Sequence, residues 1–227
     1  ATLTAGLGVA ILLGLGTWQV ERASWKDGLQ AALDARLALP PMALPQALDD
    51  PRAWSYRRVV VSGRFDHDHE MTVLAPSRDG VSGWHVVTPL VQADGTAVLV
   101  DRGWVPMGLR DAAARPAGQI AGPVTVEGVV VVPSEPGLFT PDNEPATGSW
   151  FRTDPAAMAA WAGVVAPPVL IEAGPRPVAG GFPEGGQTIV RLRNEHRGYA
   201  ATWYALAVAL AVVYVLYLRR ERRNVPR

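Results

Sequence analysis

The residues with the clearest capacity for chemistry lie in one short stretch near the C-terminal end of the chain. Asn194 is a residue type that caps helix N-termini, so it predicts a helix that begins there. One face of that helix would carry His196, Tyr199, Ala200 and Trp203. A histidine can ligate haem iron, and a haem macrocycle needs apolar and aromatic walls. The same residue types are common at a membrane–water interface, so both interpretations of His196 stand.

Two arginines precede this helix and fit either interpretation. Residues 188–193 read as a strand, in which Arg191 and Arg193 would share one face. Their guanidinium groups can pair with haem propionates, because arginine forms strong charge-assisted hydrogen bonds with carboxylates. They can equally meet lipid phosphate groups at a membrane surface.

The run Asp66–His67–Asp68–His69–Glu70 resembles a metal site. In an extended chain His67 and His69 point the same way, and neutral imidazoles suit zinc or copper. The run also joins two predicted strands, where a connecting turn must be polar in any case. The second interpretation explains the same residues without a metal.

The run Asp101–Arg102–Gly103–Trp104 ends a predicted strand. In extended form Arg102 and Trp104 share a face, and Asp101 lies on the opposite one. The run is either an edge that binds a partner or a buried structural pair, and the residues alone favour neither.

Several functions are disfavoured by what the chain lacks. It contains no cysteine, which excludes disulfides, thiolate metal sites and thiol catalysis. It has no nucleophile motif and no glycine-rich phosphate loop. We therefore expect a protein that is not an enzyme and has no nucleic-acid partner.

The elements that must position these residues begin with two charge-free apolar segments, residues 1–20 and 198–218. A helix of about 20 residues is about 30 Å long, which matches the hydrocarbon core of a bilayer. The absence of ionisable groups in both segments gives no indication of a proton or ion path. Small residues recur every fourth position, and we expect them to pack the two spans together or against a partner's helices: Gly6, Ala10 and Gly14, then Ala201, Ala205 and Ala209.

Charge predicts the orientation of the two spans. Residues 219–227 hold five arginines and Glu221, net +4, which leaves 16 basic and 20 acidic residues, net −4, between the spans. Positive charge beside a span marks the cytoplasmic face. Both termini would then be cytoplasmic, and the domain between the spans extracytoplasmic. The printed sequence begins at Ala1 without methionine, and we expect its first segment to be an uncleaved span rather than a signal peptide.

Between the spans we expect a helical extension over residues 21–39 and a β-rich domain over 40–197. Mainly antiparallel strands would form a small barrel or sandwich. A short helix is predicted over residues 155–162, with Asp154 as its N-cap and Pro155 in its first turn. The glycine- and proline-rich residues 172–186 predict a mobile loop. Strands are expected from Tyr56, where Val59, Val61 and Phe65 share a face, and over residues 69–74, 84–91, 97–105, 123–132, 169–172 and 188–193.

Taken together, these pieces resemble the surfeit locus protein 1 family of membrane assembly factors. The matching pieces are residues 15–22 (LGTWQVER) with Lys26; Tyr56 and 61–66 (VSGRFD); 83–90 (GWHVVTPL); 98–106 (VLVDRGWVP); 150–154 (WFRTD); and 194–196 (NEH) with Tyr199, Ala200, Thr202 and Trp203. The chain departs from the family at Asp101, where Asn is usual, and at Arg152, where an aromatic residue is often found.

The resemblance implies a bacterial inner-membrane factor that assists insertion of haem a into the main subunit of cytochrome c oxidase, or its retention there. It implies haem a as a transient cofactor held by His196, with the propionates near Arg191 or Arg193. We also expect partner or packing roles for Trp18, Arg102 and Trp104, and haem a synthase as a further partner. The alternative is a structural clamp that holds the oxidase subunit open for loading and binds no haem. A haem-processing hydrolase or oxidoreductase is disfavoured by the missing motifs.

Overall fold

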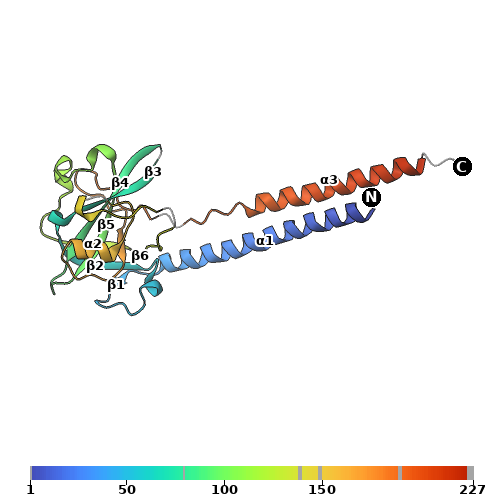
Figure 1. The fold of residues 1–227 in the computed structure, drawn as a ribbon. Coiled ribbons are helices and arrows are strands. Elements are labelled where there is room, and N and C mark those ends of the chain that lie inside the picture. Colours follow the sequence, from blue (N-terminus) through green and yellow to red (C-terminus); the bar gives the residue numbers. More distant parts are fainter. Residues whose placement is uncertain (1, 79, 138–139, 148–149, 189–190, 224–227) are drawn as a thin grey trace. The chain divides into compact units, whose positions relative to one another are not determined.

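The computed structural model describes residues 2–78, 80–137, 140–147, 150–188 and 191–223 (Figure 1). The chain divides into two compact units. One unit contains Ala1–Asp34 and Val190–Arg227, and the other contains Ala35–Ile189.

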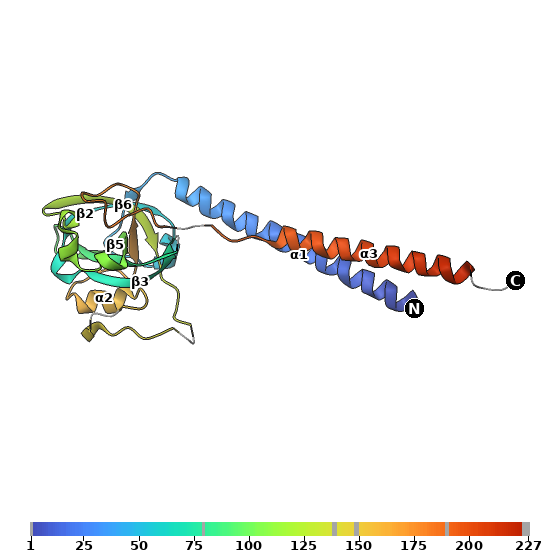
Figure 2. The same cartoon turned by 90° about the horizontal axis from the view of Figure 1, so that it is seen from above.

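Two long helices form the first unit. Helix α1 spans Thr2–Ala38 and α3 spans His196–Arg223, so the predicted first span and its extension are one continuous helix. The two helices lie side by side and antiparallel (Figures 1 and 2). At one end Tyr214 Oη donates to Thr2 Oγ1 at 2.6 Å, and at the other Asn194 Nδ2 donates to the Ala23 carbonyl at 3.0 Å.

The face of α1 that meets α3 follows a coiled-coil spacing. Apart from Gly8, its shielded residues recur at alternating steps of four and three, the spacing of a coiled coil: Ala5, Val9, Leu12, Gly16, Gln19, Ala23, Lys26 and Gln30. On α3 the most buried residues are Ala200 and Ala207, seven apart. The helices therefore pack through a heptad seam.

The small residues that pack the helices together are not those of the predicted stripes. A Cβ added at Gly6 or Gly14 would meet nothing within 4 Å. At Gly16 it would lie 2.7 Å from Cε1 of Tyr204, and at Gly8 it would lie 3.0 Å from Cδ2 of Leu210. The predicted residues Ala10, Ala201, Ala205 and Ala209 are likewise exposed. The predicted stripes face away from the seam, so the expectation that they join the two spans is wrong.

The second unit is a small β-barrel. Its strands are β1 (Met42–Ala43), β2 (Arg58–Phe65), β3 (Met71–Arg78), β4 (Val81–Val91), β5 (Ala97–Pro106), β6 (Pro123–Val131) and β7 (Leu170–Ala173). Their order is β1-β2-β6-β7-β5-β4-β3, and a further pairing of β2 with β4 closes the ring. The pairs β1–β2 and β5–β7 are parallel, and the rest are antiparallel.

Alternation along the strands separates two apolar clusters. Val59 and Val61 on β2 lie in the barrel interior with Val98 and Val100 of β5. Leu99, between those two valines, belongs instead to an outer cluster. Helix α2 (Pro155–Trp161) covers that outer cluster with Met158, which is fully buried.

Helix α2 begins as predicted. The Asp154 carboxylate accepts from the Ala157 backbone N–H at 3.1 Å, and Pro155 occupies the first turn. This cap satisfies one of the donors that a helix N-terminus leaves unpaired.

Two predicted features differ in the structure. Thr188 and residues 191–193 are not in a strand, and residues 189–190 lie outside the described part. The backbone N–H of Leu192 donates instead to Gln30 Oε1 at 2.8 Å, which replaces a sheet partner. The segment predicted as a mobile loop begins inside β7 and is then tied to the barrel. Glu184 exchanges two backbone hydrogen bonds with Trp104, and the Gly186 N–H donates to the Ala173 carbonyl.

Candidate functional site

His196 is the first residue of α3 and lies against α1. Its Nδ1 is 2.5 Å from Oε1 of Gln19, and its ring meets that of Trp18 edge-on with centroids 6.4 Å apart. An amide oxygen only accepts, so Nδ1 must carry the hydrogen. In the neutral imidazole Nε2 then has the free lone pair, and it has no hydrogen-bond partner among the described residues.

This arrangement is the one that metal-binding histidines use. A ligating imidazole usually donates its other N–H to an oxygen, which fixes the tautomer and the ring orientation. Gln19 supplies that oxygen from the facing helix. Gln19 is not among the predicted site residues; its only signal in the sequence is that it is a polar side chain at the end of an apolar segment, beside Trp18.

The other residues predicted on this helix face differ in exposure, because the contact with α1 covers only some of them. Tyr199 is 56% exposed, and Ala200 is buried. Trp203 is half-buried. Open aromatic surface on this face of α3 is therefore supplied by Tyr199 and in part by Trp203.

The two arginines lie just before α3 and are exposed. The guanidinium of Arg193 pairs with Glu195, with Nε 2.7 Å from Oε1. The backbone carbonyl of Arg193 accepts a hydrogen bond from Lys26 Nζ at 2.8 Å. Arg191 lies outside any strand, so the predicted shared face does not exist.

Asn194 joins the two helices rather than capping α3. Its Nδ2 donates to the Ala23 carbonyl and, at 2.8 Å, to Oδ1 of Asp27. Arg197 Nη2 pairs with the other oxygen of the same carboxylate at 2.6 Å. The helix begins two residues after Asn194, so the predicted cap is wrong. These contacts fix the start of α3, and with it His196, against α1.

The predicted metal run in the barrel folds into a single 3₁₀ turn, His67–His69. His67 Nε2 bonds the Ile120 carbonyl at 3.0 Å, and His69 Nδ1 lies 2.6 Å from Asp66 Oδ2. Among the residues that the structure describes, no group of three or more histidines and carboxylates could hold a metal ion. The polar-turn interpretation describes this segment.

Glu70, the last residue of that run, anchors a buried ion cluster. Arg115 donates to both of its carboxylate oxygens, and Arg102 Nη1 lies 3.2 Å from Oε2. Arg102 also donates to the Gly118 carbonyl, and its guanidinium lies 4.8 Å from the Phe65 ring. Burial lowers the pKa of Arg102 to about 10, an effect that Glu70 opposes.

The rest of the Asp101–Trp104 run is buried as well. Asp101 is 5% exposed and Trp104 is 9% exposed. Asp101 Oδ2 lies 2.7 Å from His85 Nδ1. On the neighbouring strand β7, Glu172 is the residue paired with Asp101. Burial lowers the pKa of His85, but the carboxylates of Asp101 and Glu172 outweigh it and leave that pKa above its usual value. The buried-pair interpretation describes where these side chains lie.

Fold and site together define a class: a small β-barrel domain whose chain also carries two long apolar helices joined by polar contacts around a histidine. The SURF1 family matches residues 7–208, and the chain belongs to that family. It is 39% identical to a SURF1-like protein of Monosiga brevicollis, over 94% of this chain and 85% of that one. It is 39% identical to surfeit locus protein 1 of Mus musculus and 38% identical to that of Homo sapiens, covering 74% and 75% of those proteins.

Proposed function

We propose that this protein is a non-enzymatic assembly factor that assists insertion of haem a into the main subunit of cytochrome c oxidase. Membership of the SURF1 family supports an assembly role. The single observation that carries the haem part is His196, whose Nδ1 is held by Gln19 while Nε2 is left as a free lone pair. Haem a synthase, as the source of the group, is the second proposed partner.

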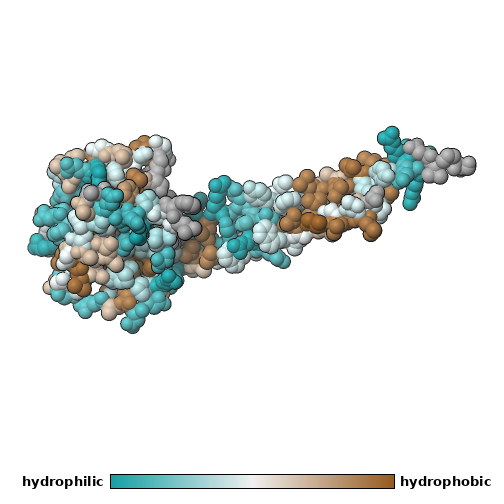
Figure 3. Space-filling model, viewed as in Figure 1, coloured by the Kyte–Doolittle hydropathy of each residue, from teal (hydrophilic) through white to brown (hydrophobic). Residues whose placement is uncertain are grey.

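The membrane is the proposed location of the helix pair. Each helix has an 18-residue apolar window of which only 6% is buried inside the structure, unlike the core helix of a soluble protein. Figure 3 shows the apolar side chains gathered on these helices and hydrophilic ones at the arginine-rich end of α3. The positive-inside rule then assigns the termini to the cytoplasm of a bacterial cell and the barrel to the outer side of its plasma membrane.

The residues around His196 fit a haem group. The free imidazole nitrogen would ligate the haem iron, and the exposed Tyr199 would supply an aromatic wall. Arg191 and the ion pair of Arg193 with Glu195 lie nearby in sequence, where propionates can compete for the guanidinium. Haem a supplies the iron that the oxidase uses for oxygen chemistry. The role of this chain is to hold the group by one side chain and to release it.

One observation favours the clamp as a second candidate function. Gly6, Ala10 and Gly14 face away from α3, and Ala201 and Ala205 of α3 face away from α1. Small residues on a membrane helix let another helix approach closely. A client helix packed on these stripes would be held without any haem on this protein.

Haem titration of the purified full chain, followed by the Soret band, tests the site. His196→Ala should abolish the Soret signature of histidine ligation. Gln19→Leu should keep ligation but weaken affinity by about 10- to 100-fold, the usual effect of losing an orienting partner. His69→Ala, a histidine of the barrel, is the matched control and should behave as wild type. Equal Soret bands in wild type and His196→Ala would refute the haem site and leave the clamp.

A further inference from the structure

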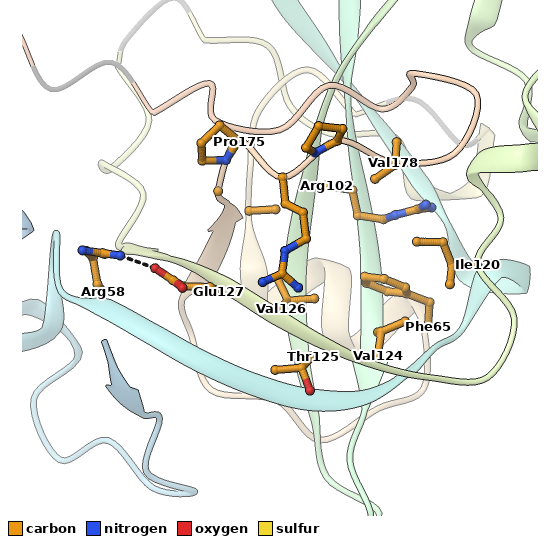
Figure 4. A pocket seen from close by; sticks show the side chains of 14 residues that line it. Arg58, Phe65, Arg102, Ile120, Val124, Thr125, Val126, Glu127, Pro175 and Val178 are labelled. Carbon is orange, nitrogen blue, oxygen red and sulfur yellow. Dashed lines mark hydrogen bonds and ion pairs between the residues drawn. The ribbon is translucent and has the colours of Figure 1, made fainter. Parts of the chain in front are cut away.

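The barrel has a pocket that the proposed function does not use. Its volume is about 530 Å³, within the range of sites that bind small molecules. It lies beside β6 and the segment that follows β7 (Figure 4). All its lining residues belong to the barrel unit, so it is separate from His196.

Most of the pocket wall is apolar. Phe65 comes from β2, Val124 and Val126 come from β6, and Ile120 and Val178 come from the flanking segments. Figure 4 shows these side chains around the cavity together with Pro175. Such a wall binds a hydrocarbon or ring body by excluding water.

The polar part of the wall is dominated by guanidinium groups. Arg58, Arg102 and Arg176 line the pocket, and Glu127 is the only acidic residue among the lining residues. Arg58 pairs with Glu127, which accounts for one positive charge. Arg176 is exposed and makes no ion pair within the described residues.

The buried cluster behind the pocket adds to this excess. Arg102 and Arg115 share one carboxylate, that of Glu70, and all three side chains are at most 6% exposed. Two cations and one anion leave a net charge of +1 away from water. A buried charge without a counter-ion is costly, so an anion at the pocket face of Arg102 would be favoured.

We propose that this pocket binds an amphipathic organic carboxylate, with its head on Arg176 and Arg102 and its apolar body on Phe65, Val124 and Val126. Arginine recognises carboxylates through paired, charge-assisted hydrogen bonds. A neutral amphiphile would fill the apolar wall but leave the positive charge uncompensated. The occupant we infer is a single-chain, fatty-acid-like molecule, because the chain carries two helices long and apolar enough to cross a membrane. The membrane location proposed above would bring such lipids close to the chain.

Photo-crosslinking of the full chain in lipid nanodiscs tests this assignment. The probe is dodecanoic acid with a mid-chain diazirine, and labelled peptides are mapped by mass spectrometry. We expect saturable labelling within residues 120–127 and 173–178. Excess dodecanoate should compete, whereas dodecanol, which has the same chain without the charge, should not. Labelling that does not saturate, or equal competition by dodecanol, would overturn the proposal.

Variants separate the head-group contact from the wall. Arg176→Ala removes an exposed side chain and should reduce labelling of these peptides about tenfold, as expected for loss of a charge-assisted hydrogen bond. Val178→Trp should block the probe by filling the pocket. Arg64→Ala, an exposed arginine of β2 outside the pocket, is the matched control and should label as wild type. Unchanged labelling in both pocket variants would also overturn the proposal.

Discussion

The seam between the two helices makes a sharp prediction about two glycines of α1. Gly16→Leu should force α1 and α3 apart, whereas Gly14→Leu should not. The Cβ alone at Gly16 would lie 2.7 Å from Cε1 of Tyr204, and the whole ring edge is within 2.9 Å. Carbon atoms pack at about 3.5–4.0 Å, so the Cβ requires a displacement of about 1 Å before the rest of the leucine is added.

Overpacking of this kind typically costs about 1–3 kcal/mol. The hydroxyl contact between Thr17 and Tyr204, at 3.2 Å, would be lost as the ring moves. At Gly14 the same side chain enters open space, because no atom lies within 4 Å of its Cβ position.

Double electron–electron resonance of the full chain in nanodiscs measures this displacement as a distance between two spin labels, one on each helix. The natural chain has no cysteine, so Ala10→Cys and Ala209→Cys would carry the only labels. Both positions are exposed, so the labels themselves should not disturb the seam. Gly16→Leu should lengthen the distance by at least about 1 Å and broaden its distribution, and Gly14→Leu should match wild type. The opposite ranking of the two variants would refute the seam.

Three further outcomes follow from the charges. A tag after Arg227 should be protected from protease in intact spheroplasts while one at Gly180 is cut, and the reverse pattern would contradict the proposed orientation. Glu70→Gln leaves two buried guanidinium groups unpaired and should lower the free energy of unfolding by about 3–5 kcal/mol in denaturant titrations, whereas the exposed Asp94→Asn should change it little. The pKa of His85 is raised in the folded protein, so the stabilisation by its charged form is present below its usual pKa and is lost as pH rises through the folded value. The midpoint temperature of thermal unfolding should therefore decrease as pH is raised from roughly 6 to 8, and it should decrease less in His85→Gln. The same pH dependence of the midpoint temperature in both proteins would contradict this.

Local patterns predicted the elements whose causes are local. The alternation of Val59 and Val61 identifies the inward face of β2, and the Asp154–Pro155 pair identifies the start of α2. The closure of the barrel could not be read in the same way. It rests on two residue pairs between β2 and β4, Arg64 with Val91 and Phe65 with Leu90, which no short-range pattern reports.

The small-residue stripes show a second limit. Gly14 and Gly16 both lie in regular glycine spacings of one helix. Which of them faces the seam depends on a bulky residue of the other helix, Tyr204, which lies more than 180 residues away in sequence. A pattern within one helix therefore identifies a close-packing helix but not the face that packs.

The residue types of the candidate sites were visible in the sequence, but their partners were not. His196 stands out by residue type and by its place beside an apolar segment, but its orienting partner Gln19 lies 177 residues earlier. Its neighbours Asp66 to His69 put Glu70 in a metal-like run, whereas its ion partner Arg115 is 45 residues distant and follows no motif. Long-range polar contacts are set by the fold, and the sequence shows only their members.

The proposed role in haem a loading is tested most directly by the haem a content of the client. The measurement is haem a per copy of the oxidase main subunit, purified from cells that lack this protein and are complemented with wild type or His196→Ala at equal expression. We predict a normal haem a content with wild type, a low content without the protein, and an intermediate or low content with His196→Ala. A haem a content that is unchanged when the protein is absent would contradict the proposed function.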